Sequence, residues 1–447
     1  MTSIVFTSLF LGLVLGSHPV GVAVQGPTAS VAFELDGKPI GRALREPWSL
    51  QVNFGVEIAP HELVARALDP SGREVARARQ WLNVPRPPAE TSLLIDRDST
   101  GRAVAARLTW QSLLGTPPRR VTVTFDGKPL DAANPARIPL PEYADDSTHL
   151  VSAEVEFSPA VVSRAGLVLG GRSRSEATSE LTGIPVRGTV GAALPSPAAL
   201  QGWFRKGNEA MSVVAVEKGP ALLLVVRDPD HAESLARFGS GGRTSFTSRG
   251  MRGSLPQYDP DYARFETRLA DEDRVRFIWP RAKRAPGAEV PTDLFDASRD
   301  FTGDFAGLHW LLTRISHPIP KGGDLRFADA VAVGGIQAYA GYTRRAVVLA
   351  LGSHIDDASR FPPALVRAYL QKIHVPLVVW SLDPRTAERI TARWGEVEDV
   401  SSYPKLKAAF ERLKASLDGQ QMVWLEGRHL PQEIALSREA RGIEILR

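Results

Sequence analysis

Residues 221–232 read Ala-Leu-Leu-Leu-Val-Val-Arg-Asp-Pro-Asp-His-Ala, an unbroken apolar run followed by an acidic cluster. A run of this length bounded by proline is typical of a strand buried on both faces, as in a parallel sheet. In such sheets ligands bind outside the carboxyl ends of the strands, which is where Asp228 and Asp230 would lie. The stretch therefore predicts a central strand that ends at a potential binding edge.

The chain beyond about residue 203 alternates between strand and helix patterns. Further strands are predicted at Arg274–Trp279, Arg345–Leu351, Val375–Leu382 and Gln421–Leu425. Apolar residues at helical spacing predict helices over Phe301–Ile315, Phe327–Ala340, Pro362–Ile373 and Leu406–Leu417. Strands that alternate with helices require right-handed crossovers, so we expect a largely parallel, doubly wound (Rossmann-type) α/β sheet with helices on both faces.

The N-terminal part of the chain shows a different, all-β pattern. The tetrapeptide Asp-Gly-Lys-Pro occurs at Asp36–Pro39 and again at Asp126–Pro129, each time inside a hairpin pattern. A similar strand follows each copy, beginning at His61 in one case and at His149 in the other. The shared order predicts a duplicated β-unit, and we expect two Ig-like β-sandwich modules in series. The alternative is a chance recurrence of a common hairpin tetrapeptide.

The first residues resemble an export signal. Ile4–Gly16 is an apolar run of signal-peptide length, and small residues follow it up to a potential cleavage point after Ala23. No Lys or Arg precedes the run, so a buried first strand and an uncleaved anchor are the alternatives. The expected order is a signal peptide (1–23), two Ig-like modules (28–85 and 89–160), a linker rich in Ser, Gly, Ala and Pro (161–202), an α/β domain (203–430) and a C-terminal tail (431–447).

Composition excludes several kinds of function. A chain of 447 residues is too long for one ordinary core, and its apolar and charged fractions of 43% and 23% are typical of globular proteins. It has no Cys, which excludes disulfides, thiolate metal sites and cysteine nucleophiles. Its net charge of +4 comes without a dense Lys/Arg run, which favours solvated charge over nucleic-acid binding. Beyond the predicted signal, no segment is typical of a membrane span.

Potentially reactive side chains gather at the ends of two predicted strands. Asp228 and Asp230 follow the first strand, and the run Ser353-His-Ile-Asp-Asp357 follows the strand at Arg345–Leu351. Neighbouring strands of a doubly wound sheet would bring these groups to one edge. No His-Glu-x-x-His, Gly-x-Ser-x-Gly or EF-hand pattern occurs, and the glycine-rich residues 238–243 lack the spacing of a phosphate-binding loop.

The order of these elements resembles the von Willebrand factor type A fold, in the bacterial group that carries Ig-like modules with Asp-Gly-Lys-Pro turns upstream. Residues 269–277 resemble its helix end, turn and second strand. Residues 322–330 (Gly-Gly-Asp-Leu-Arg-Phe-Ala-Asp-Ala) resemble its Gly-Gly-Thr-x-Leu-x-Asp-Ala segment, and residues 344–359 resemble its strand that ends in Ser-Asp-Gly-x-Asp. The resemblance covers about residues 28–427 and implies that loops at the strand ends bind a protein partner.

The resemblance also implies a metal-ion-dependent adhesion site, which in this family holds Mg²⁺ with Asp-x-Ser-x-Ser, a Thr and a further Asp. Asp228 keeps the first position, Asp230 replaces the first Ser, and Ala232 replaces the second. Asp324 occupies the Thr position and Ser353 the final Asp position. The favoured interpretation is a degenerate, metal-free site without a cofactor. The alternative is an altered cation site for Mg²⁺ or, because carboxylates are added, Ca²⁺.

Three functions fit this pattern. The favoured one is an exported, non-enzymatic adhesion-type protein, secreted or periplasmic, that binds a protein partner and no nucleic acid. The second is a Mg²⁺-dependent phosphotransferase of the haloacid dehalogenase type, with Asp228 as nucleophile and Asp230 as acid/base. That family needs an acidic pair after a later strand, where this chain offers only Asp383. The third is a structural envelope component whose strand ends bind nothing.

Overall fold

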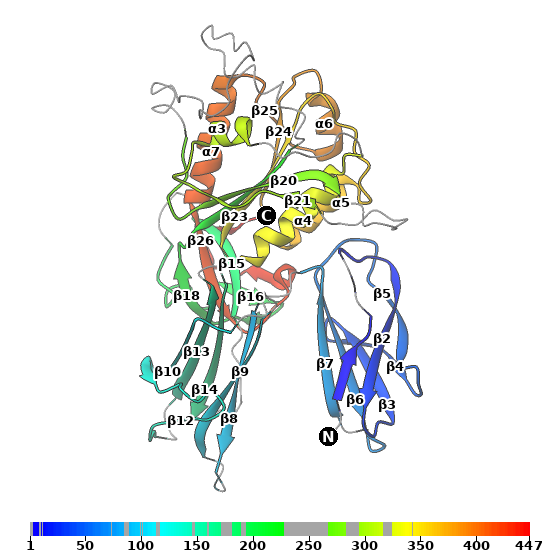
Figure 1. Cartoon of the computed structure of the whole chain (residues 1–447), viewed down its shortest axis with the longest axis vertical. Helices are drawn as coiled ribbons and strands as arrows, with labels where there is room; N and C mark the ends of the chain where they lie inside the picture. The colour runs from blue at the N-terminus through cyan, green and yellow to red at the C-terminus, as the bar shows by residue number, and fades with distance from the viewer. Residues whose placement is uncertain are drawn as a thin grey trace.

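The structure is a computed structural model, in which the chain forms two β-sandwiches, a smaller third β unit and an α/β domain (Figure 1). Among the residues described, no helix has both the length and the apolar character needed to span a bilayer. The described residues are 3–8, 10, 12–72, 74–84, 89–98, 100, 102–112, 117–144, 148–158, 161–170, 181–188, 194–227, 267–282, 295–315, 324–341 and 343–447.

The first β-sandwich, here called module 1, packs a three-stranded sheet in the order β1-β2-β5 on a four-stranded sheet in the order β4-β3-β6-β7. Its core includes Val20, Val31, Phe33 and Leu63, all fully buried. The strands are β1 (Ser3–Phe6), β2 (Ser17–Gln25), β3 (Ser30–Leu35), β4 (Lys38–Ala43), β5 (Ser49–Asn53), β6 (His61–Leu68) and β7 (Glu74–Leu82).

The second β-sandwich, module 2, repeats this topology with sheets in the orders β12-β9-β8 and β11-β10-β13-β14. Each strand is thus the counterpart of one in module 1, from β1 and β8 to β7 and β14. The strands are β8 (Ala89–Arg97), β9 (Ala103–Ser112), β10 (Arg120–Phe125), β11 (Lys128–Leu130), β12 (Ile138–Pro139), β13 (Thr148–Ser158) and β14 (Val161–Gly170). The predicted pair of Ig-like β-sandwich modules is confirmed.

The Asp-Gly-Lys-Pro turns have the same local structure in both modules. The Asp and the Gly of each turn have positive φ, between 49° and 77°, as a two-residue type I′ hairpin requires. The turn aspartate then pairs with the histidine that begins the neighbouring strand. His61 Nδ1 lies 2.8 Å from Asp36 Oδ2, and His149 Nδ1 lies 2.7 Å from Asp126 Oδ2. The repeated tetrapeptide therefore shapes the hairpin and ties it to the next strand.

The segment expected to be an export signal forms part of module 1. It supplies β1 and most of β2, and Ile4, Val20 and Val22 lie in the module 1 core. The structure therefore contains the alternative, a buried first strand. Cleavage after Ala23 would remove β1 and most of β2, which would leave β5 without its partner strand. Export and cleavage remain predictions.

A third β unit combines strands from two distant parts of the chain, in sheets of order β18-β26-β15-β28 and β17-β16-β27. Residues 161–202 and 431–447, expected to be linker and tail, instead contain strands. Residues 161–170 form β14, so module 2 extends beyond its predicted end at residue 160. The later strands belong to the third β unit, because apolar side chains such as Ile184, Val186 and Ile434 are buried here. The elements are β15 (Leu181–Gly188), β16 (Phe204–Lys206), β17 (Glu209–Ala210), β18 (Val213–Glu217), β26 (Gln420–Glu426), η3 (Pro431–Glu433), β27 (Ile434–Leu436) and β28 (Ile443–Ile445).

The α/β domain is inserted between β18 and β26, which pair antiparallel. Its sheet has the order β21-β20-β19-β23-β24-β25, with β22 beside β20. Within it β19, β20, β23, β24 and β25 run parallel, whereas β21 and β22 are antiparallel. The strands are β19 (Ala221–Arg227), β20 (Arg274–Ala282), β21 (Phe295–Ala297), β22 (Phe301–Thr302), β23 (Arg344–Leu351), β24 (Leu377–Ser381) and β25 (Glu398–Asp399).

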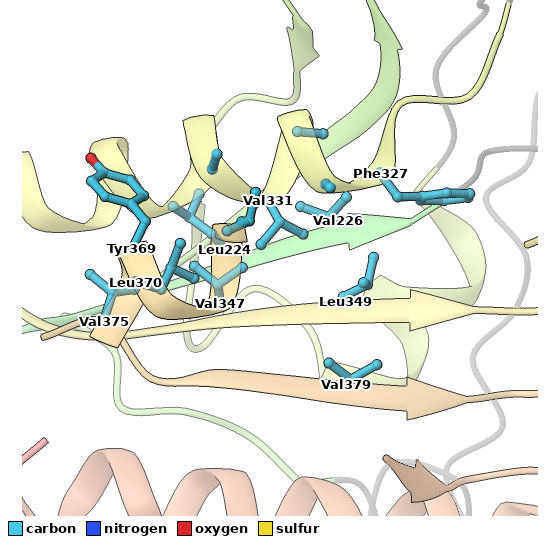
Figure 2. Packing of buried hydrophobic residues seen from close by; sticks show 14 of the residues in the cluster. Leu224, Val226, Phe327, Val331, Val347, Leu349, Tyr369, Leu370, Val375 and Val379 are labelled. Atoms are coloured by element: carbon cyan, nitrogen blue, oxygen red, sulfur yellow. The ribbon is translucent and has the colours of Figure 1, made fainter. Parts of the chain in front are cut away.

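Helices cover both faces of this sheet, as predicted. Leu224 and Val226 pack on one face against α4 and α5, where Phe327 and Tyr369 lie (Figure 2). Leu223 and Val225 point to the other face, against α3 and α7, because successive side chains of a strand alternate. The helices are α3 (Leu308–Arg314), α4 (Phe327–Ala340), α5 (Pro363–Lys372), α6 (Ala387–Trp394) and α7 (Tyr403–Asp418).

Several details of this domain differ from the sequence prediction. The helix expected over Phe301–Ile315 is only α3, and β22 precedes it. Gly303 explains the difference, since a Cβ there would lie 1.9 Å from the Ala270 carbonyl oxygen, so the backbones pack closely before α3 begins. The strand expected at Gln421–Leu425 is β26, which belongs to the third β unit and not to the parallel sheet. Helix α6 was not predicted.

Two buried arginines at the start of β23 anchor the inserted domain. Arg344 donates hydrogen bonds of 2.8 Å to the carbonyl oxygens of Gly219 and Leu417 and to Asp273 Oδ1. Gly219 and Leu417 lie where the chain enters and leaves the α/β domain. Asp273 is fully buried and also accepts a 2.7 Å hydrogen bond from the Ala221 amide. The ion pair of Arg344 and Asp273 thus joins the segments before β19 and before β26 to the start of β23.

Arg345 makes the equivalent anchor on the opposite face of the sheet. Its guanidinium donates to the carbonyl oxygens of Tyr339, Ile373 and His374 and lies 4.9 Å from the Tyr339 ring centroid. Gln420, the first residue of β26, bonds both the amide and the carbonyl of Arg345, at 2.8 and 3.0 Å. The start of β23 is therefore held to the third β unit as well.

Removing one partner of the buried ion pair should lower the stability of the α/β domain. We expect Asp273→Ala to lower the free energy of unfolding by about 3–5 kcal/mol, because the Arg344 guanidinium would remain buried without its counter-ion. Urea unfolding followed by tryptophan fluorescence measures this, since Trp279 and Trp380 are buried in the domain. The control is Lys407→Ala, which removes a partly exposed pair with Glu411 and should cost less than about 1 kcal/mol.

His374 predicts a loss of stability in acid. Burial lowers the pKa of His374 from 6.5 to about 4. Hydrogen-bond contacts with the Pro431 and Leu446 carbonyl oxygens raise the pKa, but by less than burial lowers it. In the unfolded chain His374 is protonated below pH 6.5, whereas in the folded chain it stays neutral down to about pH 4. Stability is therefore complete above pH 6.5 and falls by about 3 kcal/mol as the pH drops to 4. Urea unfolding at several pH values should show this slope in the wild type and a weaker one in His374→Asn.

Candidate functional site

The carboxyl ends of β19, β23 and β24 meet at one edge of the parallel sheet. Strands β19 and β23 are direct neighbours, as expected, with Arg227 opposite Ala350, so the ends of these two strands lie side by side. Two of the predicted site residues, Asp324 and Ser353, are described, and both are exposed. Asp228 and Asp230 lie outside the described residues.

Asp324 and Ser353 stand on two loops that are tied together. Asp324 precedes α4, and Ser353 begins the loop between β23 and α5. The Ala358 amide donates a 2.7 Å hydrogen bond to the Leu325 carbonyl oxygen, which joins the second loop to the first. A hydrogen bond thus links the loop that carries Asp324 to the loop that carries Ser353.

Asp357 strengthens this connection by capping α4. Its carboxylate accepts hydrogen bonds from the amides of Phe327 and Ala328, at 2.9 and 3.2 Å, which helix geometry leaves without intrahelical partners. A carboxylate at a helix N-terminus is also favoured by the helix dipole. Its neighbour Asp356 has a side chain that is 94% exposed. Of this acidic pair, one residue therefore builds the edge and the other faces solvent.

Asp329 is a second structural acid that the sequence analysis did not single out. It is 2% exposed and accepts hydrogen bonds from the amides of Arg360 and Phe361, at 2.9 and 3.2 Å. Arg326 Nε donates to the same carboxylate at 2.7 Å. The signal was present in the Asp-Ala pair of residues 322–330, but only the fold shows that this acid holds the β23–α5 loop.

Arg227 brings a buried positive charge to the end of the central strand. Its side chain is 1% exposed, and its guanidinium carbon lies 5.6 Å from the Phe277 ring centroid. It donates a hydrogen bond to the carbonyl oxygen of Ile315, the residue that caps the C-terminus of α3. Arginine is favoured there because helix C-termini carry partial negative charge. Sequence analysis assigned this residue no role.

Asp383, the acid that follows β24, is also engaged by its own loop. It is 9% exposed, and its carboxylate accepts hydrogen bonds from the Arg385 amide and guanidinium, at 3.0 and 2.6 Å. Thr386 Oγ1 in the same turn donates to the Gly352 carbonyl oxygen at 3.0 Å, next to Ser353. The turn after β24 is therefore joined to the loop after β23.

The described part of the edge is suited to polar recognition. Its exposed groups include the Asp324 and Asp356 carboxylates, the Ser353 hydroxyl and the His354 imidazole, the last two 3.4 Å apart, and the Arg385 guanidinium. Within the described ranges, no three His, Asp or Glu side chains lie close enough to form a metal-binding group. Hydroxyl, imidazole and carboxylate groups on fixed loops can donate and accept hydrogen bonds with a docked surface.

The similarity of this chain to known proteins is weak. No protein-family model matches the chain, and no curated protein matches it. Similar solved structures include the fibronectin(III)-like modules of Clostridium thermocellum CbhA (15% identity, 40% of this chain and 98% of that chain covered, TM-score 0.15). The central fibronectin-III array of RIM-binding protein is similar over 44% of this chain and 81% of that chain, at 13% identity and a TM-score of 0.22.

A third similar structure is the Bacteroides ovatus protein SGBP-B in complex with a mixed-linkage heptasaccharide, at 8% identity and a TM-score of 0.13, covering 47% of this chain and 89% of that chain. Because these TM-scores are low, the fold assignment rests on the strand orders described above. Fold and edge together define a multidomain protein with two Ig-like β-sandwich modules and, late in the chain, an inserted α/β domain with a mixed, mainly parallel sheet.

The two neighbouring acids of the β23–α5 loop should respond differently to mutation. We expect Asp357→Ala to lower the free energy of unfolding of the α/β domain by about 1–2 kcal/mol, because the first amides of α4 would lose their cap. Asp356→Ala is the matched control and should change it by less than about 0.5 kcal/mol. Urea unfolding of both variants measures the difference. Equal effects would contradict the assignment of Asp357 as the cap.

Proposed function

We propose that this chain is an exported, non-enzymatic protein that binds a protein partner through the loops at the carboxyl edge of its α/β domain. The observation that carries the proposal is that the acidic residues near this edge have two different roles. Asp329 and Asp357 are engaged in hydrogen bonds with backbone amides that fix the two loops, whereas Asp324, Ser353 and nearby polar groups are exposed. A fixed loop loses little conformational freedom on binding, which favours affinity.

The strand order supports the proposed von Willebrand A-like character of this domain. A largely parallel sheet with helices on both faces is what that resemblance implies, and the sheet β21-β20-β19-β23-β24-β25 is mainly parallel. Of the segment 322–330 that resembles the family's, residues 324–326 precede α4 and residues 327–330 begin it, while residues 344–359 form β23 and part of the loop that follows. The adhesion-type function is proposed on this resemblance together with the exposed edge.

We also propose that cation binding has been lost or altered at this edge. Ala232 lacks the oxygen that the family's second Ser supplies, and Ser353 replaces a carboxylate with a hydroxyl. Exposed carboxylates such as Asp324 then serve as hydrogen-bond acceptors for the partner.

A non-enzymatic role is supported by the structural hydrogen bonds that the acidic side chain at this edge accepts. A phosphotransferase of the haloacid dehalogenase type needs an acidic pair after a later strand, beside its nucleophile. Asp383 is the described candidate, and its carboxylate accepts structural hydrogen bonds from the backbone amide and the guanidinium of Arg385. The geometry of the described edge therefore favours binding over this alternative.

Substitution at the edge should abolish partner capture. We expect full-length Ser353→Arg to recover its partner from an envelope extract at least tenfold less well than wild type, because a long cation would obstruct the edge. The matched control is Ser212→Arg, an exposed serine of the third β unit, which should bind like wild type. Recovery in EDTA should equal recovery in Mg²⁺. Equal recovery by both serine variants would overturn the edge assignment, and loss in EDTA would show a cation requirement.

A further inference from the structure

Module 1 is fixed to the α/β domain by a built interface with an apolar centre. Leu13, from the β1–β2 loop, and Ile58, from the β5–β6 loop, belong to the same buried cluster as the side chains of α4 and α5. Ile58 is fully buried there. At the border, the Tyr369 hydroxyl of α5 donates a 2.7 Å hydrogen bond to the Asn83 carbonyl oxygen. Figure 1 shows module 1 (blue) beside α5.

Asn83 organises the side of this interface that belongs to module 1. Its side chain accepts a hydrogen bond from the Val14 amide and donates to the carbonyl oxygens of Val14 and Ala59, each at 2.7 Å. Asn83 has a φ of 57°, a conformation that asparagine tolerates better than most residues. One buried side chain thus joins the two loops that carry Leu13 and Ile58, so they move as a unit.

The same interface reaches the loop at the candidate site. Arg360, near the end of the β23–α5 loop, donates a 3.1 Å hydrogen bond to the Leu13 carbonyl oxygen of module 1. Its guanidinium carbon lies 4.2 Å from the Phe361 ring centroid, and the amides of both residues donate to Asp329. The loop that begins at Ser353 therefore ends in a contact with module 1.

These contacts form a continuous path from module 1 to the two loops that carry the described site residues. From Leu13 it passes to Arg360 and through Asp329 to the first turn of α4. It continues through the hydrogen bond between Ala358 and Leu325 to the neighbour of Asp324. The contacts of Arg360 with Leu13 and with Asp329 are both half-buried.

We propose that docking of module 1 on α5 is energetically coupled to the order of the carboxyl edge. Undocking of module 1 loosens the loops that carry Asp324 and Ser353, and a partner bound at that edge favours the docked arrangement. Thermodynamic linkage makes the coupling reciprocal, so a change in the docking of module 1 alters the carboxyl edge, and a change at the edge alters the docking. The inference rests on the proposed function only in treating the edge as a binding surface.

Hydrogen–deuterium exchange of the full-length chain tests this without any partner. We expect Ile58→Glu to undock module 1 and to raise amide exchange at least tenfold in residues 324–331 and 352–361. The matched control is Val56→Glu in the same loop, where the side chain is 87% exposed, and it should exchange like wild type. Wild-type protection of β3 and β6 in Ile58→Glu shows that module 1 itself stays folded.

The reciprocal variant is Arg360→Met, which keeps an apolar stem on Phe361 but removes the donor to Leu13. It should accelerate exchange at Val14 and Gly16, whose amides bond Asn83 and Gly55 within module 1. Faster exchange at Val14 in Ile58→Glu together with unchanged exchange in residues 324–331 and 352–361 would overturn the coupling. Unchanged exchange in both places would show that Ile58 does not hold the interface and would overturn it as well. Neither result depends on partner capture, so failure of the proposed function is seen separately.

Discussion

The buried ion pair between Arg344 and Asp273 is the constraint on which the rest of the α/β domain depends. Burying both charges costs several kcal/mol unless all their hydrogen-bonding groups are satisfied. Here Arg344 also donates to the carbonyls of Gly219 and Leu417, at the two points where the chain passes from β18 into β19 and from α7 into β26. The inserted domain is thereby closed at its base, and its parallel strands all point their carboxyl ends away from the third β unit.

That orientation explains why the acids near the far edge have divided roles. The loops there must be held without help from sheet hydrogen bonds, and Asp329 and Asp357 do so by accepting backbone amides at the start of α4 and α5. Acids that are used in this way are not free to bind a ligand. The exposed Asp324 and Ser353 can interact with a partner because their loops are already fixed, so binding costs little ordering.

The sequence was most informative where a local pattern determines the structure. The apolar run at residues 221–226 predicted β19, and the Asp-Gly-Lys-Pro repeats predicted matching hairpins, because strand burial and turn geometry depend on neighbouring residues. The third β unit was missed because β15 pairs with β26, which is more than 230 residues away. The apolar start of the chain suits a signal and a buried strand equally well. The roles of Arg227 and Asp329 depend on tertiary partners that no spacing reveals.

The duplicated modules show how one framework supports two different surfaces. Both keep the Asp–His pair that fixes the hairpin to the next strand. At the end where module 1 presents the apolar Ile58 to α5, the corresponding loop of module 2 carries Tyr143, whose ring lies 5.2 Å from the His149 ring and 5.0 Å from the Arg102 guanidinium. Module 1 has the equivalent aromatic contact, because the Phe54 ring at the start of its loop lies 5.8 Å from the His61 ring. The difference is that module 1 also buries Leu13 and Ile58 in the cluster that contains the side chains of α4 and α5. Burial of these two apolar side chains therefore explains why module 1, with its otherwise shared framework, supports the α/β domain.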